Sequence, residues 1–247
     1  MDLLSDMVFN ATFASKEIEK EKSVIVEEFK SRNDQPEVLL YDLWDSNNFN
    51  NSMGHSPIGD EVTINESSRK SLLNYYKKHY RPDNMIVTIT GNTDKISKEL
   101  IMKYFGKYKN EGTYTKVPFS QINPNATGKT VHKDIEQIHF YLSYPGLRAL
   151  GMGKETIEVV DYILGEGMSS RLFQTVREEK GYCYSIYTQN INMEESGSYA
   201  VGCSCSPEHT HDAIKTILKE VKEVGLGKVS KKELTKAKEK FLTKTQL

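Results

Sequence analysis

Residues 137–143 read Gln-Ile-His-Phe-Tyr-Leu-Ser, and their alternation indicates a β-strand. Ile138, Phe140 and Leu142 are apolar and fall on one face, which is the two-residue period of a strand with one buried side. The pattern predicts a strand over Thr130–Ser143.

The segments that follow this strand show either the helical period of 3.6 residues or the strand period. In chain order we expect helix Lys154–Leu164, helix Ser169–Glu179, strand Tyr182–Asn192, strand Ser198–Ser204, helix Thr210–Val224 and helix Ser230–Thr245. Because hairpin-like pairs of strands outnumber possible βαβ units, the predicted fold class is α+β, with helices packed on mostly antiparallel sheets.

A polar stretch at residues 110–128 holds two glycines and two prolines and separates this set of elements from an earlier one. We interpret it as a linker between two domains, residues 1–109 and 129–247. In the first domain the pattern predicts helices at Lys16–Arg32, Pro36–Trp44, Ile64–His79 with a start at Ser67-Ser68, and Ser97–Tyr108, and a strand at Met85–Thr90.

The charges of the chain nearly cancel, since 33 Lys and Arg against 34 Asp and Glu leave a net charge of -1. This balance gives no reason to expect nucleic acid or an anionic membrane as a partner. No run approaches the roughly 18 apolar residues of a membrane span. Cys183, Cys203 and Cys205 form no C-x-x-C pair, and the last two are expected to be small buried side chains. We therefore expect a reducing compartment and a cytoplasmic protein.

Two glutamates stand out in the predicted helix Lys16–Arg32. At about 100° per residue, Glu21 and Glu28 fall within the apolar arc that contains Ile25 and Phe29. A carboxylate on a buried face needs a cation, a metal ion or strong hydrogen-bond donors. Either these two lie at the edge of the buried face and pair with nearby lysines, or they belong to a metal site with Glu28 as the ligand and Glu21 supporting it.

The run at residues 19–29, Glu-Lys-Glu-Lys-Ser-Val-Ile-Val-Glu-Glu-Phe, resembles a segment of the pitrilysin/insulinase/mitochondrial processing peptidase family of zinc metallopeptidases. In that family this segment supplies the third zinc ligand. The resemblance implies that Glu28 is the ligand and that Glu21, seven residues earlier, supports the site.

Further matches follow in the family's order and cover nearly the whole chain. They lie at residues 54–59 (Gly-His-Ser-Pro-Ile-Gly), 76–85, 90–92, 137–139, 164–173 (Leu-Gly-Glu-Gly-Met-Ser-Ser-Arg-Leu-Phe) and 177–185. Each match is weak alone, and together they are strong. They imply two related α+β domains, both expected to be incomplete here, from a zinc metalloendopeptidase.

The family's other zinc ligands come from an H-x-x-E-H motif, which supplies two histidines and the glutamate that activates water. This motif does not occur in the sequence. Because catalytic zinc needs three protein ligands, the complete enzyme is expected to hold zinc, whereas this chain alone is expected to hold none and to be inactive.

The resemblance also assigns Arg177 and Tyr184 to contacts with the substrate backbone and with the oxyanion of the tetrahedral intermediate. Guanidinium and phenol groups are donors that can stabilise charge developing on a carbonyl oxygen. The alternative is a surface arginine and a half-buried strand tyrosine without a shared role.

Three functions remain open at this point. The first is a fragment of a zinc metalloendopeptidase that hydrolyses peptides or unfolded segments. The second is a non-catalytic substrate-binding subunit, whose partner is a homologous subunit with the zinc motif or a second copy of the chain. The third, a structural scaffold like the core subunits of respiratory complexes, ranks last because it has no need of Glu28, Arg177 and Tyr184 together.

Overall fold

The structure is a computed structural model that describes residues 1–49, 51–94, 96–110, 115 and 128–246. By their contacts these residues form two compact units, Met1–Ser31 with Pro57–Pro118 and Arg32–Ser56 with Phe119–Leu247. Most of the predicted linker, residues 110–128, lies outside the described residues. The predicted domain boundaries therefore stay a prediction.

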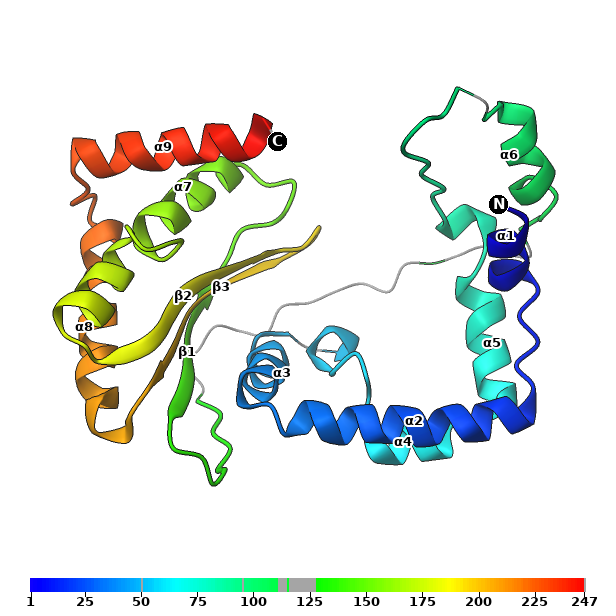
Figure 1. Ribbon diagram of the computed structural model, residues 1–247, viewed down its shortest axis with the longest axis horizontal. Coiled ribbons are helices and arrows are strands. Elements are labelled where there is room, and N and C mark those ends of the chain that lie inside the picture. The colour runs from blue at the N-terminus through cyan, green and yellow to red at the C-terminus, as the bar shows by residue number, and fades with distance from the viewer. Residues whose placement is uncertain (50, 95, 111–114, 116–127, 247) are drawn as a thin grey trace. The chain divides into compact units, whose positions relative to one another are not determined.

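The first unit is built from helices (Figure 1). They are α1 (Asp2–Phe9), most of α2 (Ser15–Asn33), α4 (Glu61–Glu66), α5 (Arg69–His79) and α6 (Lys98–Phe105), with a 3-10 turn at Pro82–Asn84. Aromatic contacts join them. Phe9 stacks on Tyr108 with ring centroids 3.9 Å apart, and the Tyr76 hydroxyl donates to the Val8 carbonyl oxygen at 2.8 Å.

Two predictions for this unit are wrong. The expected helix Ile64–His79 is two helices, α4 and α5, whereas its expected start at Ser67-Ser68 is confirmed: Ser68 begins α5 with a capping box and its side chain accepts from the Ser71 backbone N–H. The expected strand Met85–Thr90 is absent, and the described residues of this unit contain no strand. These residues are mostly β-branched, which favours a strand, but a strand forms only when a neighbouring strand pairs with it, and here Ile86 is 94% exposed.

The second unit contains a three-stranded antiparallel sheet in the order β1-β3-β2 (Figure 1). The strands are β1 (Ile138–Pro145), β2 (Cys183–Asn192) and β3 (Gly197–Cys205). The first predicted strand begins at Ile138, eight residues later than expected, and the other two are within a residue of their expected bounds at each end. This sheet and its helices confirm the α+β class.

Helices cover both faces of this sheet. On the face that carries Val201 and Cys203, α7 (Lys154–Leu164) and α8 (Thr210–Gly225) form the main core. Outside them, α9 (Lys231–Gln246) packs against α7 through Ala237. The remaining helical segments of the unit are α3 (Pro36–Asn48) and shorter turns at Asn51–Gly54, Phe173–Glu179 and Pro207–His209.

Helix α3 packs on the opposite face of the sheet, against β1 (Figure 1). The Trp44 indole donates to the Ser143 hydroxyl at 2.9 Å, and that hydroxyl donates to the Asn48 side-chain oxygen at 2.9 Å. The Trp44 ring also lies 5.1 Å from the ring of Tyr141. Trp44 is only 3% exposed, so it anchors α3 to the sheet.

Candidate functional site

The two glutamates on α2 are exposed to solvent. The buried residue of this helix is Val26, whereas Ile25 and Phe29 are half-buried. The expectation that Glu21 and Glu28 lie on the core-facing arc is therefore wrong within this unit.

Nearby lysines do not pair with these two glutamates either. Lys22 pairs with Glu19 at 3.0 Å and Lys30 with Glu27 at 2.9 Å. Within the described part of the chain, the side chains of Glu21 and Glu28 have no hydrogen bond or ion pair. Their carboxylates are open to a ligand from outside this unit, and their role stays a prediction.

Arg177 lies on the helical turn Phe173–Glu179, which is wound as a π-helix. Gly181, at a φ of 62°, ends it in the left-handed conformation that glycine adopts without strain. The Tyr182 N–H then donates to the Val176 carbonyl at 3.0 Å, and β2 begins at the next residue. This tight turn brings the chain back past Arg177.

Tyr184 occupies an irregularity at the start of β2. Cys183 is opposite Cys205 of β3 and Ser185 is opposite Ser204, so Tyr184 is the extra residue of a β-bulge. Its side chain is 76% exposed. A bulge re-aims a side chain, and here it directs the tyrosine out of the core.

The turn and the bulge bring the two predicted residues together. The Cζ atom of Arg177 lies 5.0 Å from the ring centroid of Tyr184 and 4.6 Å from that of Phe173. The Arg177 Nε atom is 3.7 Å from a Glu178 carboxylate oxygen. The surroundings thus hold a charged donor group beside an exposed phenol, which is an arrangement that can bind a carbonyl oxygen or an oxyanion.

Sequence reasoning did not single out Phe173. The signal was available, because an aromatic residue four positions before an arginine lies on the same side of a helix and can stack on its guanidinium.

The same bulge places Cys183 among the buried thiols. Cys183, Cys203 and Cys205 are all buried and free, which confirms the expectation for the last two. A hydrogen bond with Cys203 and the positive charge of Arg177 lower the pKa of the Cys183 thiol. The thiol is part of the main core of this unit.

A second polar group that the sequence did not reveal lies on the α3 side of the sheet. The hydroxyls of Tyr141 and Tyr187 are 3.0 Å apart, above Gly202 of the central strand. Burial and the hydrogen bond from Tyr187 raise the pKa of Tyr141. Their hydroxyl contact joins the two outer strands, β1 and β2, across the central strand β3.

The described residues do not fit a catalytic zinc ion. They contain no group of three or more His, Cys, Asp or Glu side chains that could hold a metal. Glu28 is a single exposed carboxylate, and zinc in a catalytic site needs three protein ligands.

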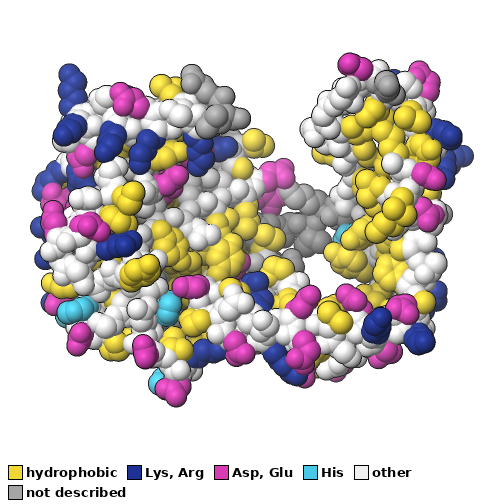
Figure 2. Space-filling view, in the orientation of Figure 1, with side chains coloured by type: hydrophobic (Ala, Val, Ile, Leu, Met, Phe, Trp, Pro, Cys, Tyr) yellow, Lys and Arg dark blue, Asp and Glu magenta, His cyan; other side chains and the backbone are white. Residues whose placement is uncertain are grey.

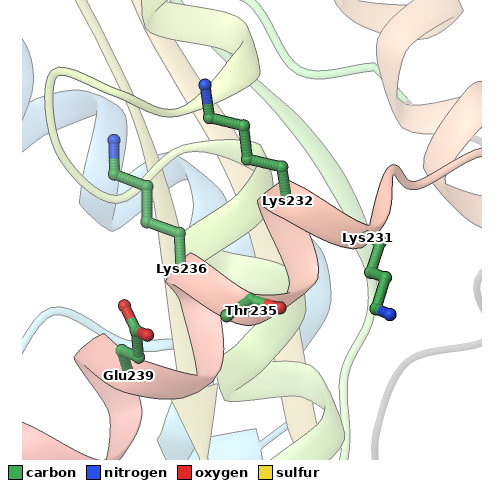
Figure 3. A pocket seen from close by; sticks show the side chains of 5 residues that line it. All are labelled: Lys231, Lys232, Thr235, Lys236 and Glu239. Atoms are coloured by element: carbon green, nitrogen blue, oxygen red, sulfur yellow. The ribbon is translucent and has the colours of Figure 1, made fainter.

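The other surface features carry no comparable chemistry. A hollow of about 550 Å³ is lined only by Lys231, Lys232, Thr235, Lys236 and Glu239 of α9. Its side chains do not converge, and Lys231 points away from Lys232 and Lys236 (Figure 3). Basic and acidic side chains are interspersed on the visible face of each unit (Figure 2). Among the described residues, no helix is long and apolar enough to span a membrane.

Comparison with known proteins shows what the chain resembles. A family model described as "Peptidase M16 inactive domain" matches residues 67–241. The chain is 33% identical to the uncharacterized zinc protease YmxG of Bacillus subtilis over 246 residues, which cover 98% of this chain and 59% of the relative. It is 27% identical to the uncharacterized zinc protease SCO5738 of Streptomyces coelicolor, over 96% of this chain and 53% of that protein.

A solved structure agrees in fold. The crystal structure of a protease from Helicobacter pylori superimposes with a TM-score of 0.85 at 22% identity, over 94% of this chain and 58% of that one. The chain thus spans between half and three-fifths of the length of these relatives.

Proposed function

The chain belongs to the peptidase M16 family, as its resemblance to zinc metallopeptidases predicted, and we propose that it contributes the substrate-binding part of a zinc-dependent metalloendopeptidase. In this proposal Arg177 and Tyr184 bind the backbone of a peptide or an unfolded segment. The observation that supports it most is their contact, with the guanidinium 5.0 Å from the tyrosine ring.

The proposed chemistry of these two residues is electrostatic. When water attacks a peptide carbonyl, negative charge develops on its oxygen, and donors held in place beforehand stabilise that charge. Arg177 offers N–H groups and a full positive charge, and the exposed Tyr184 hydroxyl offers one further donor. Both residues act on the substrate and require no metal of their own.

Catalysis in this proposal needs groups that the chain does not contain. Zinc in the complete enzyme is held by two histidines of an H-x-x-E-H motif, which is absent from this sequence, and by Glu28 as the third ligand, with Glu21 in support. The chain alone is therefore proposed to bind no zinc and to cleave nothing.

The second candidate is a non-catalytic substrate-binding subunit of a two-chain peptidase. Presence of the Arg177 and Tyr184 pair in a sequence without the zinc motif favours it. Its partner is then a homologous subunit that carries the motif. Exposure of Glu28 rather than burial leaves that carboxylate available to such a partner.

The decisive test compares cleavage of a fluorogenic peptide by the chain alone and by the chain mixed with an H-x-x-E-H homologue from the same source. We expect no cleavage alone and zinc-dependent cleavage by the mixture above that of the homologue by itself. Zinc-dependent cleavage by the chain alone contradicts the proposal.

Peptide binding is tested without metal, by fluorescence anisotropy of a labelled unfolded peptide. Arg177→Ala is expected to weaken binding about tenfold, because a hydrogen bond from a charged donor contributes about 1.5 kcal/mol or more. Arg148→Ala is the matched control, since Arg148 is exposed in the loop after β1 and is expected to leave binding unchanged. Equal effects of the two substitutions show a nonspecific charge effect.

A further inference from the structure

Arg177 lies close to two aromatic rings. Its guanidinium carbon is 4.6 Å from the centroid of Phe173, one helical turn earlier, and 5.0 Å from that of Tyr184 on β2. Guanidinium groups stack on aromatic faces at such distances, and each contact contributes about 0.5–1 kcal/mol at an exposed site. Two rings restrict the plane of the guanidinium far more than one ring does.

Stacking leaves the in-plane N–H groups of an arginine available. Within the described residues, Arg177 has one charged neighbour, Glu178, at 3.7 Å from Nε, and its two Nη groups have no hydrogen-bond acceptor. A hydrogen-bond acceptor that approaches in the plane of the Arg177 guanidinium therefore meets N–H donors that are already oriented.

Most other arginines of the chain are committed to acceptors within it. Arg32 binds Asp42 at 2.6 Å, Arg81 binds Asp83 at 2.8 Å, and Arg69 donates to the Phe13 carbonyl at 2.8 Å.

Arg171, six residues before Arg177, makes the comparison sharper. It binds Glu233 at 2.5 Å, lies 3.8 Å from Glu220, and donates to the Lys228 carbonyl oxygen. Arg171 joins the start of its helix to α8 and α9. Arg177, by contrast, is held by rings and not by acceptors.

Both elements that carry these side chains depart from regular geometry. Phe173 and Arg177 belong to the π-helical turn, and Tyr184 is the extra residue of the β-bulge. Such departures cost free energy and are frequent at functional sites. Their shared result is the stack of Phe173, Arg177 and Tyr184.

From this geometry we infer that Phe173 is a positioning residue, which with Tyr184 holds the Arg177 guanidinium so that its Nη edge meets a peptide carbonyl or carboxylate oxygen. The inference rests on the proposed function of Arg177. It adds that the orientation comes from the two rings, and that replacement of Phe173 weakens substrate binding without direct contact with the substrate.

The first test is spectroscopic and needs no substrate. In ¹H–¹⁵N spectra of the full chain, the Arg177 Nε–Hε signal is expected upfield of that of Arg148, because ring currents shield a proton that lies over aromatic faces. Phe173→Leu is expected to move it toward the Arg148 position, and Phe173→Tyr to leave it in place. An unshifted signal in Phe173→Leu overturns the inference.

The second test measures binding of the labelled peptide. Phe173→Leu is expected to weaken binding about two- to fivefold, the loss of one cation–π contact, and Phe173→Tyr to restore it. Equal weakening by Leu and Tyr shows a merely structural role and overturns the inference. Circular dichroism and thermal unfolding select variants that are folded, with Phe173→Met, which also lacks an aromatic ring, as the replacement if the leucine variant is not.

The two proposals fail in different ways. If Arg177→Ala leaves peptide binding unchanged, the proposed function fails. If Arg177→Ala weakens binding and Phe173→Leu does not, the function stands and the positioning role of Phe173 is wrong.

Discussion

At the scale of single residues, Gly202 is the point at which the side chains of Tyr141 and Tyr187 approach the central strand closely. A Cβ atom at this position lies 2.6 Å from a ring carbon of Tyr141 and 2.7 Å from one of Tyr187. Both rings are fixed by their hydroxyl contact at 3.0 Å. Glycine is therefore the residue that lets the two aromatic side chains meet across the central strand.

Gly202→Ala is expected to destabilise the protein by about 1–3 kcal/mol, because an added methyl group in a packed site forces its neighbours apart. Chemical denaturation measures the change. Gly225→Ala is the control, since an added Cβ at the end of α8 meets no atom within 4 Å, and it is expected to be neutral or to stabilise by up to about 1 kcal/mol. A Gly202→Ala protein as stable as the wild type contradicts the tyrosine contact.

Glu233 makes stability depend on pH in the acidic range. Its hydrogen bond with Arg171 lowers the pKa of the carboxyl from 4.5 to about 2. A carboxyl with a lowered pKa in the folded state contributes stability above its unfolded pKa and loses it as the pH falls. The contribution is complete above about pH 4.5 and is lost between there and about pH 2.

Replacement of this carboxylate tests that dependence. Glu233→Gln is expected to cost about 2 kcal/mol at pH 7, because Arg171 loses a charged acceptor, and about zero near pH 2. Urea unfolding at both pH values gives the two differences. A cost that is the same at both contradicts the assigned ion pair.

At the scale of elements, the sequence predicted helices with a regular apolar period more accurately than strands, which need a second strand to pair with. The bounds of α7 agree with the predicted Lys154–Leu164 because its apolar residues repeat at the helical period. Met85–Thr90 is rich in β-branched residues, but no strand among the described residues pairs with it. The periodicity of the sequence does not predict the π-helical turn or the bulge at Tyr184, because both arise from packing between elements.

The same limit applies to the candidate site. The family resemblance predicted Arg177 and Tyr184 as a pair, and the structure adds that the two side chains are in contact. Phe173 was not readable as a partner, since its stacking depends on how the helix and β2 meet. Exposure of Glu21 and Glu28 was also not predictable, because helical periodicity describes which residues share a side and not what covers that side.

Ser68 lies between α4 and α5 and caps the start of α5. Ser68→Ala is expected to cost about 1 kcal/mol, since its side chain accepts from the Ser71 N–H at 3.1 Å at the start of α5. Thermal unfolding measures the loss. Ser67→Ala is the control, because that hydroxyl donates only to the Thr63 carbonyl oxygen, and its cost is expected to stay within about 0.5 kcal/mol. Equal costs contradict the cap.

At the scale of the whole molecule, the predicted site residues fall in different compact units. Glu21 and Glu28 belong to the first, and Arg177 and Tyr184 to the second. Helix α2 passes from one unit to the other at Ser31, two residues before its end. A function that needs both pairs therefore needs both units.

The proposed role of Glu28 as a zinc ligand in the assembled enzyme is tested by comparison with the neighbouring residue Glu27. Glu28→Gln in the mixture with an H-x-x-E-H homologue is expected to abolish the gain in cleavage and in zinc bound per chain, because an amide replaces the anionic ligand. Glu27→Gln is the control. Glu27 is also exposed on α2, pairs with Lys30, and is expected to leave both quantities unchanged. Bound zinc is measured by atomic absorption after gel filtration. A loss of zinc in Glu28→Gln but not in Glu27→Gln supports a ligand that acts across chains. Loss of cleavage with zinc unchanged contradicts that role and leaves the Arg177 and Tyr184 pair as this chain's contribution to the enzyme.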